Sequence, residues 1–288
     1  MRTEAIDTEL TQARDRGPLR EIKIPPCPVL LTRLRKAMQM REPDLAEVQA
    51  IAAADVAMSA TLLRVANSPV HLGDGAPCVS VGQAMMRLGL KPTTALMTAF
   101  LVRNAVPVQS THLQRFWERS TKRSVAMEFL SRQIPGLDGD LASAHGLFCH
   151  VGMPVLLQAV KGYGATLVEA AARIDRPYVA TEDANHRTNH AVVGALTARA
   201  WGLPSTLMAS VRLHHDFTVL RETSAEHDVA LLVASGLVAE FLMRQHEGLS
   251  PDADWNQHGE EALAWLNVAE TTMQEWGDQL EPLLDYAV

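Results

Sequence analysis

The sequence predicts an all-α protein. Apolar residues recur at helical spacing along the 288-residue chain, and no sustained alternation of apolar and polar residues indicates half-buried strands. Aromatic residues make up only 5% of the chain and apolar residues 47%, so it has a globular composition and is long enough to bury a full core. Its three cysteines are irregularly spaced, which excludes a disulfide framework and a four-cysteine zinc site.

Prolines and helix caps divide the first half of the chain. The prolines that follow Ile24 predict an extended entry, because proline restricts its own backbone and that of the residue before it. Asp44 and Asp55 are placed to cap the helices that follow them, and Ser80 with Gln83 has the spacing of a capping box. The predicted helices are 29–40, 44–53, 55–66, 80–89 and 91–103.

Longer helices are predicted in the second half, after a boundary at Val106-Pro107. They are 113–133, 141–160, 166–174, 182–201, 204–215, 229–243, 260–266 and 271–284. A loop is expected at Gly162–Gly164. The most apolar helix, 229–243, contains Glu240 and is shorter than the roughly 20 residues of a spanning helix, so it is predicted to be a buried core helix. The polar N-terminal segment lacks the apolar stretch of a secretory signal, and a cytoplasmic protein without a membrane anchor is expected.

Charge is unevenly distributed. Ten of the 33 acidic residues and none of the 26 lysines and arginines lie in 247–288, so the rest of the chain carries a net formal charge of +3. The total of −7 argues against a general DNA-binding protein, which needs a basic footprint. The acidic segment also contains apolar residues such as Trp255, Trp276, Leu280 and Leu284, too many for a disordered tail, and is predicted to pack on the body.

Histidines are the first candidates for chemistry, since six of the eleven cluster in the second half. They are His145, His150, His186, His190, His214 and His215. His186 and His190 are predicted to share one face of a helix, the spacing of a helical metal site. Hydrolytic metal sites usually also need carboxylates, and no acid stands one or four residues from His150. Packed or surface histidines are therefore favoured over a metal site, and no metal or other cofactor is expected.

Two further features allow a functional interpretation. Cys149 is adjacent to His150, but consecutive residues on a helix face apart, so a buried inert thiol is favoured over a nucleophile. Arg115, Arg119 and Lys122 are predicted to share one helix face, which is either a solvated surface paired with acids or a contact for an anion or nucleotide.

Six segments, in this order, resemble HDOD domains. They are IPPCPVLLTRL, DVAMSATLLRVANSP, VSVGQAMMRLGLKP, LFCHVGMPVL, HAVVGALTARAWGLP and VRLHHDF. The resemblance implies an all-α fold related to the HD metal-dependent phosphohydrolases, with an HDOD region at 22–246. Its N-terminal helical lobe would be 22–106 and its HD-like helical lobe 107–246. A helical extension at 1–21 and an acidic helical extension at 247–288 complete the predicted organisation.

The chain departs from the HD hydrolases at most of the positions that hold their metals. Where a first histidine is expected stands Arg119, and the His-Asp pair is replaced by Cys149 and His150. Ser235 falls near the last aspartate. We call these positions, together with His190, His214 and His215, the degenerate pocket. Loss of the carboxylates would remove the charge that holds a divalent ion, so no catalytic or metal-binding residue is predicted.

The resemblance implies a non-catalytic bacterial signalling protein, because HDOD domains are regarded as regulatory or output domains. The predicted partner is an unidentified signalling protein. A residual metal-dependent phosphohydrolase and a sensor that binds a cyclic nucleotide or another anion in the degenerate pocket remain as alternatives. If Arg119 lies beside His150 and His190 without an acid, the pocket should attract anions. An acid such as Glu128 or Asp216 that pairs with Arg119 would abolish that attraction.

Overall fold

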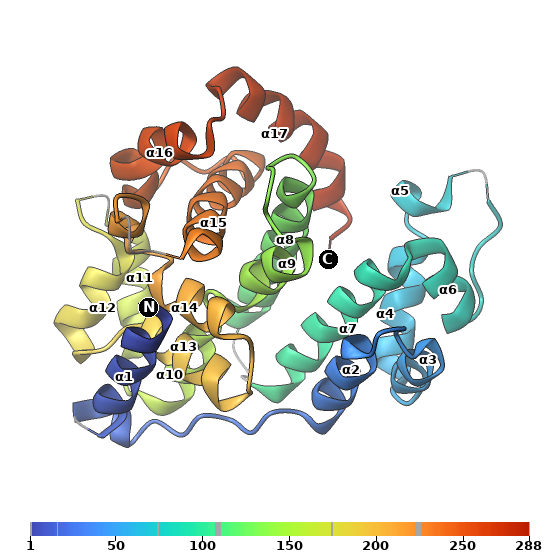
Figure 1. Ribbon diagram of the computed structural model, residues 1–288, viewed down its shortest axis with the longest axis horizontal. Helices are drawn as coiled ribbons and strands as arrows, with labels where there is room; N and C mark the ends of the chain where they lie inside the picture. The colour runs from blue at the N-terminus through green and yellow to red at the C-terminus, as the bar shows by residue number, and fades with distance from the viewer. Residues whose placement is uncertain are drawn as a thin grey trace. The chain divides into compact units, whose positions relative to one another are not determined.

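Helices are the only regular secondary structure in the described part of the chain. The computed structural model describes residues 2–15, 17–73, 75–106, 111–173, 175–222 and 226–287, and these contain no strand (Figure 1). The all-α prediction is confirmed. The chain divides into two compact units. The larger unit is Met1–Pro25 with Val108–Leu284, and the smaller unit is Pro26–Pro107 with Asp285–Val288. The N-terminal extension and the acidic C-terminal segment thus belong mainly to the larger unit.

The smaller unit is built from short helices with the predicted caps. Asp44 accepts a hydrogen bond from the backbone N–H of Glu47, and Asp55 accepts from the next helix at 2.8 and 3.0 Å. The Ser80 hydroxyl accepts from the N–H of Gln83, whose own side chain accepts from the residue before Ser80. The helices are α2 (Val29–Gln39), α3 (Leu45–Ala53), α4 (Val56–Ala66), α5 (Pro69–Leu72), α6 (Val81–Leu88) and α7 (Leu90–Ala105). Their core includes Leu31, Leu34, Ile51, Met58, Leu62 and Met97.

The larger unit is built around α15, in which 13 of the 20 residues are buried. Helices α8, α9, α14 and α16 pack against it, and α13 lies between α10 and α14. The elements are α1 (Arg2–Asp15), η1 (Gly17–Arg20), α8 (Thr111–Ser131), α9 (Gly139–Phe148), α10 (Gly152–Ala159), α11 (Tyr163–Ala172), α12 (Tyr178–His186), α13 (His190–Ala200), α14 (Ser205–Leu213), η2 (Phe217–Leu220), α15 (His227–His246), α16 (Ala253–Leu266) and α17 (Glu270–Asp285).

The predicted helix 141–160 is wrong, because the chain turns between α9 and α10. A Cβ atom at Gly152 would lie 2.1 Å from the carbonyl oxygen of His190 and 2.7 Å from the backbone nitrogen of Gly194. The turn brings this glycine into direct contact with the backbone of α13. His150 therefore sits in a turn and not on a helix face.

The predicted helix 182–201 is also wrong. Arg187 adopts a left-handed conformation (φ 56°) that ends α12, and the Asn189 side chain accepts from the N–H of Val192 to begin α13. His186 and His190 consequently lie on different helices and do not share a face. The loop expected at 162–164 is likewise wrong beyond its first residue, since α11 begins at Tyr163.

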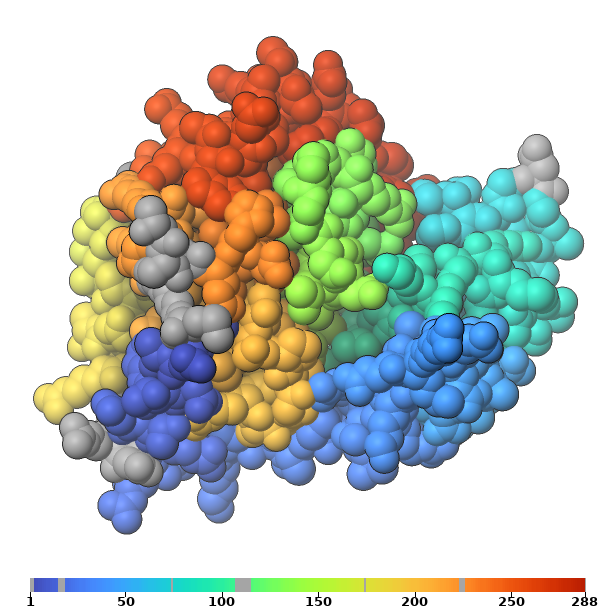
Figure 2. Space-filling model, in the orientation of Figure 1, coloured from blue at the N-terminus to red at the C-terminus, as the bar shows by residue number. Residues whose placement is uncertain are grey.

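The acidic C-terminal segment packs on the larger unit, as predicted. Leu263, Trp276, Leu280 and Leu284 are buried, and Trp255 stacks on Phe241 of α15 with ring centroids 3.8 Å apart. In Figure 2 this segment, drawn in red, forms a continuous surface with its neighbours in the larger unit.

Among the described residues, no single helix has both the length and the apolar character needed to cross a membrane. Only α3 and α4 together satisfy that test, as a pair bent by 111°.

Candidate functional site

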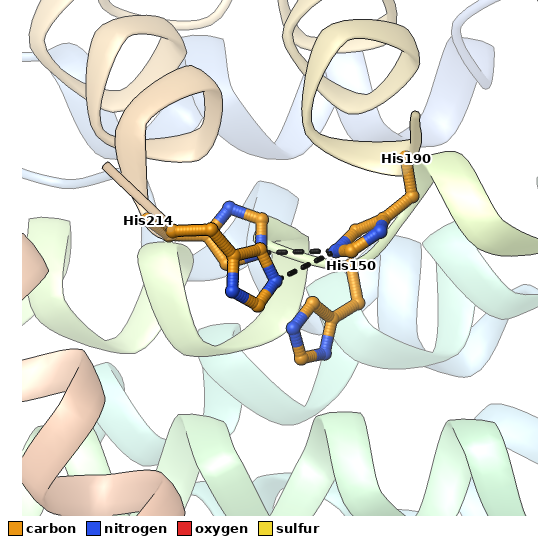
Figure 3. A group of neighbouring side chains, drawn as sticks. His150, His190 and His214 are labelled. Atoms are coloured by element: carbon orange, nitrogen blue, oxygen red, sulfur yellow. Dashed lines mark hydrogen bonds between the residues drawn. The ribbon is translucent and has the colours of Figure 1, made fainter. Parts of the chain in front are cut away.

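Four histidines from three junctions of the larger unit converge at one point (Figure 3). His150 lies in the α9–α10 turn, His190 is the first residue of α13, and His214 and His215 follow the end of α14. We call these four residues the histidine cluster. Their candidate ligand atoms all lie within 4.8 Å of one another. The Nε2 atom of His190 is 3.1 Å from that of His214 and 3.2 Å from that of His215.

The other ring nitrogen of three cluster members is held by an acceptor. Nδ1 of His190 lies 2.6 Å from a carboxylate oxygen of Glu182, and Nδ1 of His214 lies 2.7 Å from the carbonyl oxygen of Val211. Nδ1 of His215 contacts the Asp254 carboxylate. A carbonyl or ionised carboxylate can only accept, so each Nδ1 carries a proton and donates it. In the neutral ring this leaves the Nε2 lone pair directed into the cluster.

Glu182 is a fully buried carboxylate with three donors. The Tyr163 hydroxyl, the backbone N–H of His190 and the Nδ1–H of His190 all point to it. Burial alone would raise the pKa of the Glu182 carboxyl, but His190 and the Tyr163 hydroxyl outweigh burial and hold that pKa below its usual value. Glu182 is therefore ionised at neutral pH.

Burial sets the charge of the imidazoles. It lowers the pKa of His150 and His214 well below the usual histidine value, and the nearby Arg123 lowers the pKa of His150 further. The pKa of His190 is also lowered by burial, which exceeds the opposing effect of Glu182. For His215, burial is outweighed by the Asp254 carboxylate, which raises the pKa. At least three members of the cluster are thus neutral near pH 7.

Arg119 is ion-paired, which contradicts the expectation of an unpaired cation. It contacts both Glu240 and Glu247, while the buried Arg123 places Nε and Nη2 at 3.1 and 2.7 Å from one oxygen of Glu240. Burial raises the pKa of the Glu240 carboxyl, but Arg123 and Arg119 outweigh it and lower the pKa to about 2. The premise of the predicted anion attraction therefore fails at Arg119.

The two acids proposed as alternative partners of Arg119 lie elsewhere. Glu128 near the end of α8 pairs with Arg132 just after that helix, and Asp216 caps η2 through Thr218. The acids that do pair with Arg119 come from α15 and the residue after it. They lie more than 100 residues along the chain from Arg119, so no local pattern indicates the contact.

The remaining candidate residues take no part in the cluster. Cys149 is 2% exposed, its thiol faces the carbonyl of Gly146 at 3.8 Å, and burial raises its pKa. The Ser235 hydroxyl is fully buried and has no hydrogen-bond partner in the described part of the chain. Nδ1 of His145 contacts Ser210. His186 lies outside the cluster and bonds Thr166.

A cavity of about 660 Å³ opens onto the cluster. His150, His214 and His215 line it, whereas His190 is completely buried behind them. The lining also has more basic than acidic side chains. The arginines are Arg115, Arg119, Arg123, Arg173, Arg176 and Arg244, and the acids are Glu240, Asp252 and Asp254.

Comparison with known proteins identifies the fold family. The HDOD domain model matches residues 24–217. The chain belongs to the HDOD domain family. A putative phosphohydrolase from Shewanella amazonensis SB2B has a similar structure, with a TM-score of 0.69, 18% identity and coverage of 94% of this chain and 95% of that one. A putative signal transduction protein from Marinobacter aquaeolei VT8 has a TM-score of 0.72 and 15% identity, covering 100% of this chain and 65% of that one.

A curated relative is longer than this HDOD protein. It is an uncharacterized protein of Treponema pallidum (strain Nichols), 22% identical over 230 residues. The match covers 79% of the HDOD chain but only 44% of the relative, so the chain spans less than half of that protein's length. The two structural neighbours carry different functional names on one fold, and their low identities show the fold alone.

Sequence reasoning missed the carboxylates around the cluster. Glu182 and Asp254 were not among the candidate residues. The sequence analysis favoured a metal-free pocket because it found no acid near His150, and these two carboxylates contact the cluster. Glu240 did give a signal, because a lone acid inside an apolar helix must be paired if it is buried. Asp254 gave none, since it lies 39 residues from His215 in the chain.

Proposed function

We propose that this HDOD protein is a regulatory module that does not hydrolyse phosphoesters and acts by binding a signalling protein. One observation carries the proposal. At positions where the HD hydrolases hold their metals, this chain has side chains that are engaged in other contacts. Arg119 is tied to Glu240 and Glu247, and the Cys149 thiol is buried with a raised pKa. A hydrolytic centre needs a metal that keeps a position for water, and these groups supply no ligand of that kind.

Exposed apolar side chains in the smaller unit support the protein-binding part of the proposal. Of the ten large apolar residues exposed in the described chain, seven lie between 26 and 107. They are Val29, Met40, Leu45, Val56, Val70, Val79 and Met86. Single exposed apolar residues are common, but their concentration in one unit of this size is typical of an interaction region.

The catalytic part is tested by hydrolysis assays on the full chain. Phosphomonoesters, linear dinucleotides and cyclic dinucleotides are incubated with protein loaded with Mg²⁺, Mn²⁺, Fe²⁺ or Zn²⁺. The expected result is no turnover above that of His190→Ala. Turnover that His190→Ala abolishes would show a phosphohydrolase and overturn the proposal.

The binding part is tested by cross-linking in the native cell, followed by mass spectrometry. A triple variant, Val56→Ser with Val79→Ser and Met86→Gln, removes the three most exposed apolar side chains of the smaller unit. Val168→Ser, an exposed position in the larger unit, is the matched control. We expect a partner that the wild type and control capture and the triple variant loses. Identical capture by all three proteins would argue against binding through this unit.

A second candidate function, a ligand sensor, is favoured by the cavity. Its volume of about 660 Å³ is in the range of small-molecule sites, and six arginines line it. A ligand that binds only the folded state raises the melting temperature. A nucleotide and phosphate panel should then raise the Tm of the wild type more than that of Arg115→Ala, which removes a lining arginine other than the ion-paired Arg119. Equal, negligible shifts in both proteins would exclude this function for the ligands tested.

A further inference from the structure

The histidine cluster brings together lone pairs that repel one another unless a cation lies between them. The Nε2 atoms of His190, His214 and His215 approach to 3.1 and 3.2 Å. Each of these rings donates from Nδ1 to its own acceptor, so none of these Nε2 atoms has a proton to donate when the rings are neutral. In the described part of the chain, the His150 ring has no hydrogen-bond partner either, and its ring centroid is 4.9 Å from those of His190 and His214.

We propose that His150, His190, His214 and His215 bind one transition-metal ion of the zinc class. Imidazole nitrogen is a ligand that Zn²⁺, Cu²⁺ and Ni²⁺ prefer over Mg²⁺ or Ca²⁺. In a tetrahedral site with Zn–N bonds of about 2.0–2.1 Å, the nitrogens lie about 3.3 Å apart. The distances of 3.1 and 3.2 Å agree with two edges of such a tetrahedron. His150, in its turn, completes the site by a small movement of its ring.

The surroundings of the cluster match a divalent cation. Ligating histidines usually donate their second N–H to a carboxylate or a backbone carbonyl, as three of these rings do. The Glu182 and Asp254 carboxylates lie directly behind two of the rings, where they would offset the positive charge of a bound divalent ion. Nearby, Arg123 is paired with Glu240 and does not leave an uncompensated positive charge.

Four protein ligands would fill the coordination sphere of this ion. A closed sphere leaves no position for an activated water, which is typical of structural sites and not of hydrolytic ones. The ion would tie together the α9–α10 turn, the start of α13 and the end of α14. The inference therefore goes beyond the proposed function and does not depend on it. Metal binding together with phosphoester hydrolysis would refute only the proposed function.

The test uses the full chain, freed of any affinity tag and stripped with a chelator. Zn²⁺ is added back, and bound metal is measured after gel filtration by mass spectrometry. The expected result is one ion per chain and a higher Tm, because the ion binds only the folded state. Co²⁺ in its place should give the intense visible bands of a tetrahedral site without thiolate-to-cobalt charge transfer. These wild-type measurements do not require any variant to fold.

Variants then assign the ligands. We expect His190→Ala, His214→Ala and the turn variant His150→Ala to lower Zn²⁺ affinity by more than about 100-fold, and Glu182→Gln by about 10- to 100-fold. His186→Ala is the matched control, since His186 lies outside the cluster and bonds Thr166. No Zn²⁺ uptake by the wild type, an octahedral or thiolate Co²⁺ spectrum, or full affinity in folded His150→Ala and His214→Ala would each overturn the proposal.

Discussion

Replacing Glu240 by glutamine should destabilise the larger unit. It should also make the free energy of unfolding less sensitive to acidic pH. The variant keeps the side-chain shape but removes the charge that pairs with Arg123, which is 4% exposed. Arg119 retains Glu247 as a partner, so the loss falls mainly on Arg123. Removing one member of a buried ion pair typically costs about 3–5 kcal/mol, because the other charge stays buried.

The pKa of Glu240 gives the same magnitude independently. In the folded protein this pKa is about 2, against a usual 4.5. At about 1.4 kcal/mol per pH unit, this lowering corresponds to about 3 kcal/mol of folding free energy. The contribution is complete above pH 4.5 and is lost as the pH falls toward 2, so about 2 kcal/mol should remain at pH 3.5.

Urea unfolding followed by circular dichroism at pH 7 and pH 3.5 measures both effects. The free-energy difference between wild type and Glu240→Gln should be about 3 kcal/mol at pH 7 and smaller at pH 3.5. Glu275→Gln, at an exposed position on α17, is the control and should change little. A difference below about 0.5 kcal/mol at pH 7, or one that does not shrink in acid, would refute the assignment of Glu240 as the charge partner of Arg123.

Three further variants test the packing around the site and in each unit. Gly152→Ala should cost at least about 3 kcal/mol in urea unfolding, since its Cβ would meet backbone atoms of α13 at 2.1 and 2.7 Å, whereas Gly164→Ala, with 3.6 Å to its nearest neighbour, should be tolerated. Trp276→Ala should lower stability by about 3 kcal/mol by opening a cavity under α17, and an unchanged Tm would contradict the packing of the acidic segment. Asn67→Ala should cost about 1–3 kcal/mol because Asn67 pairs with both backbone groups of Cys78, and unaltered protection of that N–H in hydrogen exchange would argue against the contact.

The sequence predicted the start of a helix well where the contacts that fix it join residues close together in the chain. Asp44, Asp55 and Ser80 cap helices through hydrogen bonds to backbone groups two or three residues away, so a short stretch of sequence contains both partners. The two broken helices were missed for the opposite reason. The turn after Cys149 exists because Gly152 contacts α13, and that contact is visible only once both helices are placed.

The difference between short-range and long-range contacts also explains which parts of the candidate site could be predicted. The cluster residues His150, His190, His214 and His215 were all identified in the sequence, because each lies in a recognisable motif. Their interpretation depended on the acids around them, and these were sought at helical spacing from His150. Glu182 is only eight residues before His190, but the assumed continuous helix would have placed it away from the ring, and the break at Arg187 folds it back.

The chemistry of the pocket therefore depends on acids outside the motifs of the family. In the two proposals, loss of carboxylates from the ligand positions would remove a water-activating centre, whereas the imidazoles backed by Glu182 and Asp254 would still bind a metal ion. If both proposals hold, this chain has lost hydrolysis and kept an ion. This separates two properties that the HD hydrolases combine, and it is why metal content and turnover must be measured separately in this protein.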